Sequence, residues 1–396
     1  MMSRRPSNAP ERGGGAVWLA DFSPVWRCFA ALALVFAFAL ALAGCVRPGP
    51  SVLIPTGIVA PGAKLVTVYV ATTRVREPGT FNVYTDGRAP ELNYAEFTIA
   101  IPPHHKTGEI EWPAGTPDPQ TNFVTVQQRL LTSQEFERKV AARGADRKAG
   151  VFVHGFNVNF QEGVFRLAQL ASDADLDGVP VLFAWPSDAK AIGYIADKDG
   201  ATYSRDALAH VLTVMTRDRK PGQVTLLGHS MGAWLTVEAL RQLRLSGRNT
   251  TLARLNVILA SPDIDVDVFR AQTQVIGPLT PPMTVLVSRD DKALAISSRI
   301  AGERKRLGSV DVDDPVVQET ARAAHVRIVD ISNLQSPDQF NHDRFVTYAA
   351  LYSRLSAMDR SRAGGDAGQA GAFVLNTVGS VLSSPFTLAG SVLSGQ

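Results

Sequence analysis

Residues 224–233 read Val-Thr-Leu-Leu-Gly-His-Ser-Met-Gly-Ala. The β-branched and leucine-rich beginning predicts a short strand, and apolar residues at helical spacing from Ala233 to Leu243 predict a helix directly behind it. A Gly-x-Ser-x-Gly pentapeptide between a strand and a helix is typical of a nucleophile elbow, a strained turn that exposes its serine. The pattern therefore predicts that Ser230 is a nucleophile. The alternative is an ordinary strand–helix turn that happens to contain the pentapeptide.

Composition limits the classes of protein to consider. The chain has 396 residues, of which 45% are hydrophobic and 19% charged, as expected for a globular protein with a buried core. The net charge is only +3 and the basic residues are dispersed, which argues against nucleic-acid binding. Cys28 and Cys45 are the only cysteines, and both precede the globular part. A structural disulfide or a cysteine-based zinc site in that part is therefore excluded.

The N-terminal segment has the features of a bacterial lipoprotein signal. Four arginines lie within residues 1–27, and an uncharged apolar run, 28–43, leads into Leu-Ala-Gly-Cys. The run is short for a membrane span and fits the core of a signal peptide. The tetrapeptide resembles a lipobox, in which Cys45 is acylated and becomes the mature N-terminus. Val46 after the cysteine favours the outer membrane, on its periplasmic side. A plain membrane anchor or a non-lipidated signal is the alternative.

We therefore divide the chain into four parts. Residues 1–45 are the signal segment with the lipobox, and 46–64, rich in proline and glycine, are expected to form a tether. Residues 65–360 form the enzyme-like domain. In the remaining part, 361–396, no charged residue follows Asp366. That last part is interpreted as a loosely packed tail, with a membrane-contacting segment as the alternative.

From residue 150 onward, strand and helix patterns alternate. Apolar strands joined by helices predict an α/β fold, a mostly parallel sheet covered by helices on both faces. Residues 186–203 are expected to be a loop over the active site, and Thr132 with Glu135 predicts a capping box. Strands are expected at 66–71, 95–101, 123–127, 151–153, 181–185, 224–227, 257–260, 284–287 and 327–331.

A nucleophilic serine requires a base, and we select it by position among the seven histidines. In α/β-hydrolases the acid and then the histidine follow the serine along the chain. His229 cannot reach the hydroxyl of the neighbouring serine as a base, and His325 begins a strand at the wrong edge. His342 follows the last strand, where catalytic groups collect at the carboxyl ends of parallel strands. We predict that His342 is the base; the alternative is a surface histidine that caps the last helix.

The remaining members of the site are an acid and two oxyanion donors. The acid should follow the strand 284–287, where Asp290 and Asp291 are neighbours that spacing alone cannot separate. Asp263 and Asp265, past an earlier strand, are interpreted as turn and N-cap residues. The amide of Met231, at the start of a helix, is one expected oxyanion donor. The amide of Phe156, in a His-Gly-Phe turn after another strand, is the second.

Between about residues 65 and 355 the chain resembles a family of bacterial α/β-hydrolases of unknown function. That resemblance implies a serine-hydrolase triad without a known substrate, and the family pattern places the acid directly before Lys-Ala-Leu, which favours Asp291. One departure is Asn341 before His342, where a glycine is expected. The matching stretches are Tyr69–Arg74, Val151–Asn157, Phe183–Ser187, Gly193-Tyr194 with Asp197 and Ser204, the elbow, Ser261–Asp263, Asp291–Leu294 and His342.

The sequence thus predicts a lipid-anchored serine hydrolase that acts on carboxylic esters or related acyl groups, in a small molecule or a lipid. It implies no metal and no organic cofactor. One alternative is an amidase or peptidase with the same triad. The other is a non-catalytic envelope lipoprotein that keeps the fold as a binding module. Acyl chain length and oligomeric state are not readable from the residues.

Overall fold

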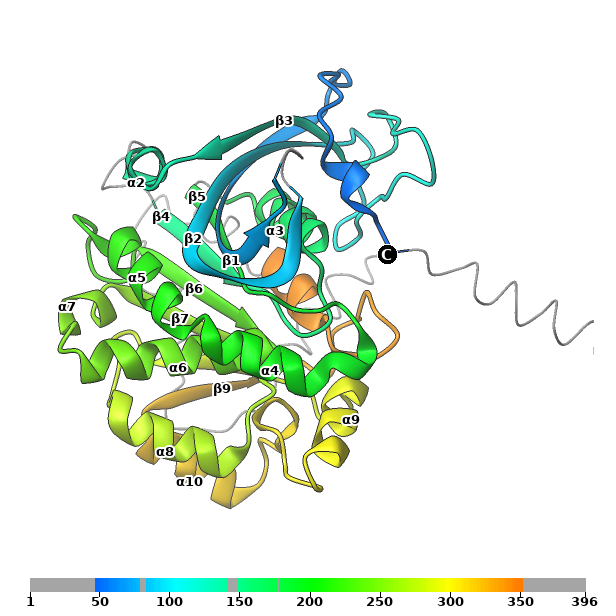
Figure 1. Ribbon diagram of the computed structural model, residues 1–396. Helices are drawn as coiled ribbons and strands as arrows, with labels where there is room; N and C mark the ends of the chain where they lie inside the picture. The colour runs from blue at the N-terminus through cyan, green and yellow to red at the C-terminus, as the bar shows by residue number, and fades with distance from the viewer. Residues whose placement is uncertain (1–46, 79–82, 142–147, 177, 352–396) are drawn as a thin grey trace, which may run out of the picture. The chain divides into compact units, whose positions relative to one another are not determined.

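One sheet organises the domain, with the strand order β3-β2-β1-β5-β4-β6-β7-β8-β9 (Figure 1). The computed structural model describes residues 47–78, 83–141, 148–176 and 178–351. The strands are β1 (Lys64–Arg76), β2 (Tyr84–Ile101), β3 (Val124–Leu131), β4 (Lys148–Val153), β5 (Gly178–Ala184), β6 (Val224–His229), β7 (Leu255–Ala260), β8 (Met283–Val287) and β9 (Val326–Asp330). All the strands expected from the sequence are therefore present, with some ends shifted.

Most of the sheet is parallel. β1 pairs in parallel with β5, and every pair from there to β9 is also parallel. Only β1–β2 and β2–β3 are antiparallel. The parallel strands are apolar along most of their length because helices cover both faces; β5, for example, is buried at every position after Gly178. The predicted α/β-hydrolase fold is confirmed.

Helices on the two faces of the sheet form two separate apolar cores. α3 packs against one face together with Phe345, and α5 and α6 pack against the other (Figure 1). The α-helices are α2 (Ser133–Ala141), α3 (Phe160–Asp173), α4 (Tyr194–Tyr203), α5 (Arg205–Thr216), α6 (Met231–Leu245), α7 (Asn249–Leu252), α8 (Val266–Ile276), α9 (Lys292–Ile300) and α10 (Pro315–Ala323). Short 3-10 turns are η1 (Pro50–Leu53), η2 (Ala191–Gly193) and η3 (Leu307–Ser309). Residues 344–351 are also helical.

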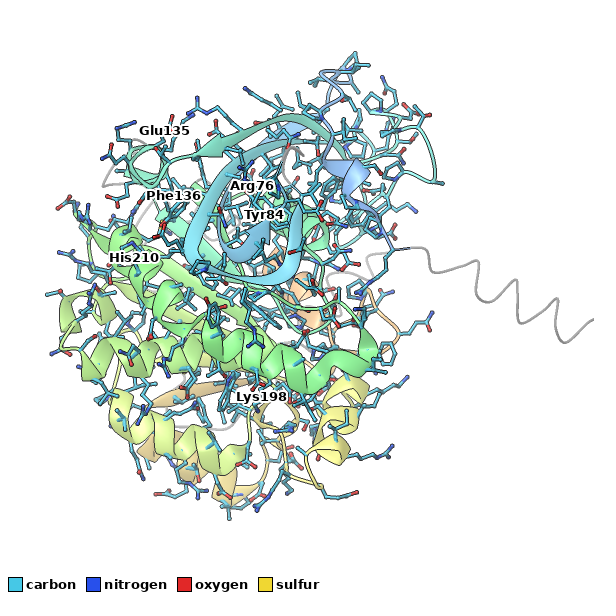
Figure 2. All side chains as sticks on the ribbon, viewed as in Figure 1. Arg76, Tyr84, Glu135, Phe136, Lys198 and His210 are labelled. Carbon is cyan, nitrogen blue, oxygen red and sulfur yellow. The ribbon has the colours of Figure 1, made fainter. Side chains whose placement is uncertain are left out.

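Several local predictions hold. Thr132 and Glu135 form the expected capping box at the start of α2, with the Glu135 carboxylate accepting from the Thr132 amide at 2.8 Å (Figure 2 labels Glu135). Asp265 caps α8, as expected. The predicted signal segment with Cys45 and the predicted tail 361–396 lie outside the described residues. Within the described ranges, no helix is long and apolar enough to span a bilayer.

The expectation of a loop at 186–203 is wrong, because this segment contains η2 and α4. Its helical pattern is weak in the sequence because polar and small residues face inward. Asp197 is buried and accepts hydrogen bonds from the Ser187 hydroxyl and the Asp188 amide. Gly200 packs so closely on the Pro186 carbonyl that a Cβ would lie 2.9 Å from its oxygen. An inward carboxylate and glycine disrupt the apolar periodicity by which a helix is recognised.

The expectation of a free tether at 46–64 is also wrong from Pro48 onward. Leu53 in η1 is buried, and the Thr56 amide donates to the Thr125 carbonyl of β3 at 2.8 Å. The Pro48 carbonyl accepts from the side-chain amides of Asn159 and Gln161 on the first turn of α3. Proline and glycine here mark an irregular segment that packs on the domain, and composition alone does not distinguish such a segment from a linker.

Candidate active site

Ser230 lies in the sharp turn between β6 and α6. Its backbone has φ 55° and ψ −120°, in the left-handed half of conformational space that non-glycine residues rarely occupy. The neighbouring glycines permit this turn because any side chain there would collide with the backbone. A Cβ on Gly228 would lie 2.9 Å from the Ala233 Cα, and one on Gly232 would lie 2.9 Å from the His154 carbonyl carbon. The geometry is that of a nucleophile elbow, as the sequence predicted.

The loop after β4 lies directly against this elbow. A Cβ on Gly155 would be 3.0 Å from the Ser230 Cβ, so the loop approaches the serine more closely than a side chain would allow. The loop is held by Trp185, whose indole N–H donates to the His154 carbonyl at 2.7 Å and whose ring stacks on the His154 ring. Burial lowers the pKa of His154 to about 3, so its ring is neutral. Phe156, an expected oxyanion donor, follows Gly155 in this loop.

His342 and Asp291 are hydrogen bonded to each other. The His342 Nδ1 lies 2.6 Å from the Asp291 Oδ2, and the Asp291 side chain is fully buried. The other oxygen, Oδ1, accepts from the Leu294 amide at 2.9 Å and caps α9. Burial by itself lowers the pKa of His342, but the charge and hydrogen bond of Asp291, together with the charges of Asp343 and Asp263, outweigh it, and the pKa rises to about 9. Nδ1 is the imidazole nitrogen that faces the carboxylate, which leaves Nε2 as the other basic position.

Asp290, the neighbour that spacing could not separate from Asp291, has different partners. Its carboxylate pairs with the Arg344 guanidinium, 2.9 Å from Nη2 to Oδ2, and accepts from the Asn341 side-chain amide at 2.8 Å. The Arg344 hydrogen bond lowers the pKa of Asp290 to about 2. Asp290 therefore holds the loop that carries His342, but it does not contact the imidazole.

Asn341 occupies the position where a glycine was expected. Its φ is 60°, in the left-handed region that glycine adopts without strain. Asparagine is among the few other residues that tolerate this conformation. The departure from the family pattern thus preserves the backbone turn that presents His342.

Hydrogen bonds at the end of β7 connect the elbow to the loop that carries His342. The Ser230 amide donates to the Ala260 carbonyl at 2.9 Å, and the next residue, Ser261, donates its hydroxyl to the His342 carbonyl at 3.2 Å. Among the described residues, the Ser230 hydroxyl forms no hydrogen bond. The serine–histidine hydrogen bond is often long in hydrolases without substrate.

His229 supports the imidazole of His342, a role that the sequence did not reveal. Its ring lies between the rings of His342 and Phe345, with centroid distances of 4.6 and 4.4 Å. Burial, followed by the charge of His342, lowers the pKa of His229 to about 3. His229 is therefore a neutral packing surface. His210, another of the seven histidines, is exposed on α5 (Figure 2).

Asp263 does more than form a turn. It is buried, pairs with Arg306 at 3.1 Å, and accepts hydrogen bonds from the hydroxyls of Tyr194 and Ser297, each at 2.8 Å. Its amide donates to the Ser230 carbonyl at 3.2 Å. The residue thus joins the elbow to α4 and α9. The only sequence signal for this role was its place in the family-like stretch Ser261–Asp263.

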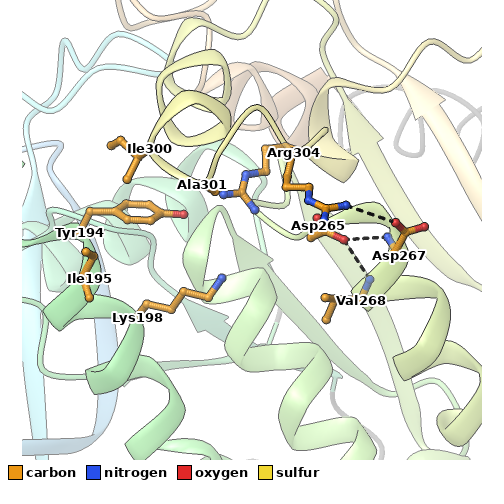
Figure 3. A pocket seen from close by; sticks show the side chains of 10 residues that line it. Tyr194, Ile195, Lys198, Asp265, Asp267, Val268, Ile300, Ala301 and Arg304 are labelled. Carbon is orange, nitrogen blue, oxygen red and sulfur yellow. Dashed lines mark hydrogen bonds and ion pairs between the residues drawn. The ribbon is translucent and has the colours of Figure 1, made fainter.

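A cavity of about 620 Å³ lies beyond this network. Figure 3 shows Tyr194 and Lys198 directed into it from α4, with Asp265 and Arg304 opposite. The Tyr194 ring also packs edge-on against Phe156, at a centroid distance of 5.4 Å, so the cavity adjoins the loop beside Ser230. The residues of the described ranges form no cluster of three or more side chains suited to a metal ion.

Residues 131–360 match the family model described as "Alpha/beta hydrolase of unknown function (DUF900)", which covers more than half of the chain. The chain belongs to this family. The resemblance inferred from the motifs is confirmed, and with it the α/β-hydrolase class. No functionally curated protein matches the chain.

Among solved structures, the chain is similar to esterases from Rhizomucor miehei, with 10% identity, coverage of 74% of this chain and 83% of that one, and a TM-score of 0.30. A putative hydrolase from Agrobacterium vitis S4 has 12% identity, 73% and 98% coverage, and a TM-score of 0.29. A thermophilic carboxylesterase cloned from a metagenomic library has 12% identity, 75% and 90% coverage, and a TM-score of 0.33. Scores this low add nothing to the family assignment.

Proposed function

We propose that the protein is a serine hydrolase that cleaves carboxylic esters or related acyl groups through Ser230, His342 and Asp291. The observation that carries the proposal is the 2.6 Å hydrogen bond between His342 and a buried Asp291, beside a serine in the strained elbow geometry. A serine is a weak nucleophile until a base removes its proton, and the base requires an acid that fixes its orientation. In this proposal His342, after β9, is the base and Asp291, after β8, is the acid, and the hydrogen bond between them supports the assignment.

In the proposed reaction the Ser230 Oγ attacks the acyl carbon while His342 Nε2 accepts the hydroxyl proton. The Asp291 carboxylate keeps the other nitrogen, Nδ1, protonated and stabilises the imidazolium that forms. The carbonyl oxygen becomes an oxyanion, which accepts hydrogen bonds from the amides of Met231 and Phe156. The dipole of α6, which begins at Met231, adds to this stabilisation. His342 then returns its proton to the leaving group, and water hydrolyses the acyl-enzyme.

A fluorophosphonate probe tests the nucleophile directly. We expect covalent labelling of the intact protein at Ser230, identified by peptide mass, and no labelling of Ser230→Ala with an unchanged melting temperature. A folded protein that the probe leaves unlabelled would support the binding-module alternative. Ester and amide substrates with the same acyl group, compared by kcat/KM, separate an esterase from an amidase; preference for the amide would replace the ester proposal.

We also propose that Cys45 is acylated and anchors the mature protein to the bacterial envelope. The proposal rests on the uncharged run and the Leu-Ala-Gly-Cys motif that ends at this residue. Cys45→Ala should prevent lipoprotein processing, so that the precursor accumulates. A mature mass and membrane partitioning identical to those of the wild type would contradict acylation.

A further inference from the structure

The start of the domain is attached beside the active site. The Pro48 carbonyl accepts from Gln161 Nε2 at 2.6 Å and from Asn159 Nδ2 at 3.3 Å. Asn159 is the N-cap of α3 and follows the loop that contains Phe156. The chain therefore joins the domain at the catalytic edge of the sheet, not at a distant surface.

Only two residues separate Cys45 from Pro48. Three Cα–Cα steps extend to about 11 Å at most. A lipid on Cys45 would consequently keep Pro48, which is hydrogen bonded to the first turn of α3, within about that distance of the point where the chain enters the bilayer. A long flexible tether would let the domain turn freely, whereas this short connection restricts which face meets the membrane.

The same edge carries an unusual helix, α9. Its solvent-exposed face consists of Lys292, Ala295, Ile296, Arg299 and Ile300, at helical spacing, and the helix contains no acidic residue. Buried Leu294 and Ser297 form its inner side. Exposed isoleucines flanked by cations are the pattern of a helix that lies in the lipid headgroup region.

Further apolar side chains extend this face across the cavity. Ile192 in η2 is 95% exposed, and Ile195 in α4 is 72% exposed. Ile195 and Ile300 line the same cavity, so the α4 and α9 sides are adjacent (Figure 3). The Ser187 hydroxyl, just before η2, accepts from the Val158 amide at 3.3 Å, which connects this side to the loop that holds Pro48.

We propose that η2, the start of α4 and the outer face of α9 dock onto the lipid bilayer that holds the acyl chains of Cys45. We define Ile192, Ile195, Ile296 and Ile300 as the docking face. Figure 1 shows α9 and the start of α4 on the same side of the domain as its first described residues. The inference takes the anchor and the active-site location from the proposed function, and it adds that the acyl substrate comes from the bilayer.

A bilayer fits this face better than a second protein copy does. The short connection brings a membrane to this edge without any further partner, and Lys292 and Arg299 match anionic headgroups. The segment before β1 provides an alternative surface that could contact the bilayer in place of the docking face. Its exposed apolar residues are Ile54, Ile58 and Val59.

Fluorescence of single labelled positions tests the proposal in the mature full-length chain, reconstituted in phosphatidylethanolamine–phosphatidylglycerol vesicles. Cys28 belongs to the signal segment and Cys45 would be acylated, so a cysteine introduced on the surface is the only free thiol. An environment-sensitive NBD label on Ile192→Cys should shift to the blue and be quenched by spin-labelled lipid. Leu245→Cys is the control, because Leu245 ends α6, about 22 Å along the helix from the elbow.

Each outcome decides the proposal. Quenching at position 192, with none at 245, supports the docking face. A solvent-like label at 192, or quenching only of a label on Ile58→Cys, contradicts it. If the labelled protein is quenched at 192 yet hydrolyses no ester, the docking of this face stands, whereas the proposed function and the acyl substrate from the bilayer fail.

Activity provides a second measurement. Ile192→Ser with Ile296→Ser should slow hydrolysis of a long-chain ester embedded in the vesicles by about fivefold or more, because apolar area no longer enters the interface. Hydrolysis of a water-soluble short-chain ester should be unchanged. The matched control is Leu176→Ser with Leu245→Ser, which removes similarly exposed leucines at the ends of α3 and α6 away from the elbow. Equal rates for both double variants on vesicles would contradict the proposal.

Discussion

Replacing Asp291 with asparagine separates the proposed catalytic role of this residue from its structural one. Asp291 Oδ2 binds His342, and Oδ1 caps α9 through the Leu294 amide. Asparagine is as good an N-cap as aspartate, so the cap survives. The side-chain NH₂ that replaces the second oxygen can only donate. His342 must then place its proton on Nε2, the nitrogen that has to accept the serine proton.

We expect Asp291→Asn to lower kcat by up to about 10⁴-fold, as in serine proteases with the wrong tautomer. Each tenfold change is about 1.36 kcal/mol, so the loss of transition-state stabilisation is about 5.4 kcal/mol. The melting temperature should change little. Without the carboxylate that raises the pKa of His342, burial is the main influence on this pKa and should lower it. The rise of kcat/KM with pH should then occur at lower pH than in the wild type.

Asp290→Asn is the matched control, with the same chemical change one residue away. Asp290 binds Arg344 and Asn341 instead of the imidazole, and its side chain is 53% exposed. An ion pair at such a site contributes about 1 kcal/mol or less to stability. We expect kcat to fall less than about tenfold. A large loss of kcat at position 290 together with near-normal activity at 291 would refute the reasoning.

Four further predictions concern the same site. Ser230→Ala and His342→Ala should each lower kcat by several orders of magnitude and the double variant by little more, because triad members act as a unit; additive losses in kcat would argue against His342 as the base. kcat/KM should rise with pH through the His342 pKa of about 9, since only the neutral imidazole accepts a proton, and a pH–rate profile that is flat above pH 7 would contradict this. The raised pKa also stabilises the fold fully below about pH 6.5, and this contribution is lost as pH rises through about 9, which thermal unfolding at pH 6 and 10 measures. Gly232→Ala should cost about 3 kcal/mol or prevent folding, because its Cβ would meet the His154 carbonyl; an unchanged melting temperature would contradict the elbow packing.

The central parallel strands could be predicted because each is a short, largely buried apolar run. The elbow could be predicted for a related reason: glycines at 228 and 232, a serine between them, and a helix pattern behind are all local. Prediction from local patterns failed at α4, where Asp197 and Gly200 face inward and interrupt the apolar period. It failed again at Pro48, because the partners that fix it, Asn159 and Gln161, are more than a hundred residues away in the chain.

Sequence by itself determined the fold class and the family, and it predicted the candidate serine and histidine, because each is encoded in contiguous residues or in their order along the chain. Tertiary structure alone decided which of two adjacent aspartates meets His342. Neighbouring residues at a helix start point in different directions, so Asp291 reaches the imidazole while Asp290 turns to Arg344. Tertiary structure also decided that buried, neutral His229 packs against His342. It likewise decided that Asp263, whose amide is bonded to the elbow, pairs with Arg306. Those contacts join residues from separate strand ends, and distances of that kind arise only when the sheet is assembled.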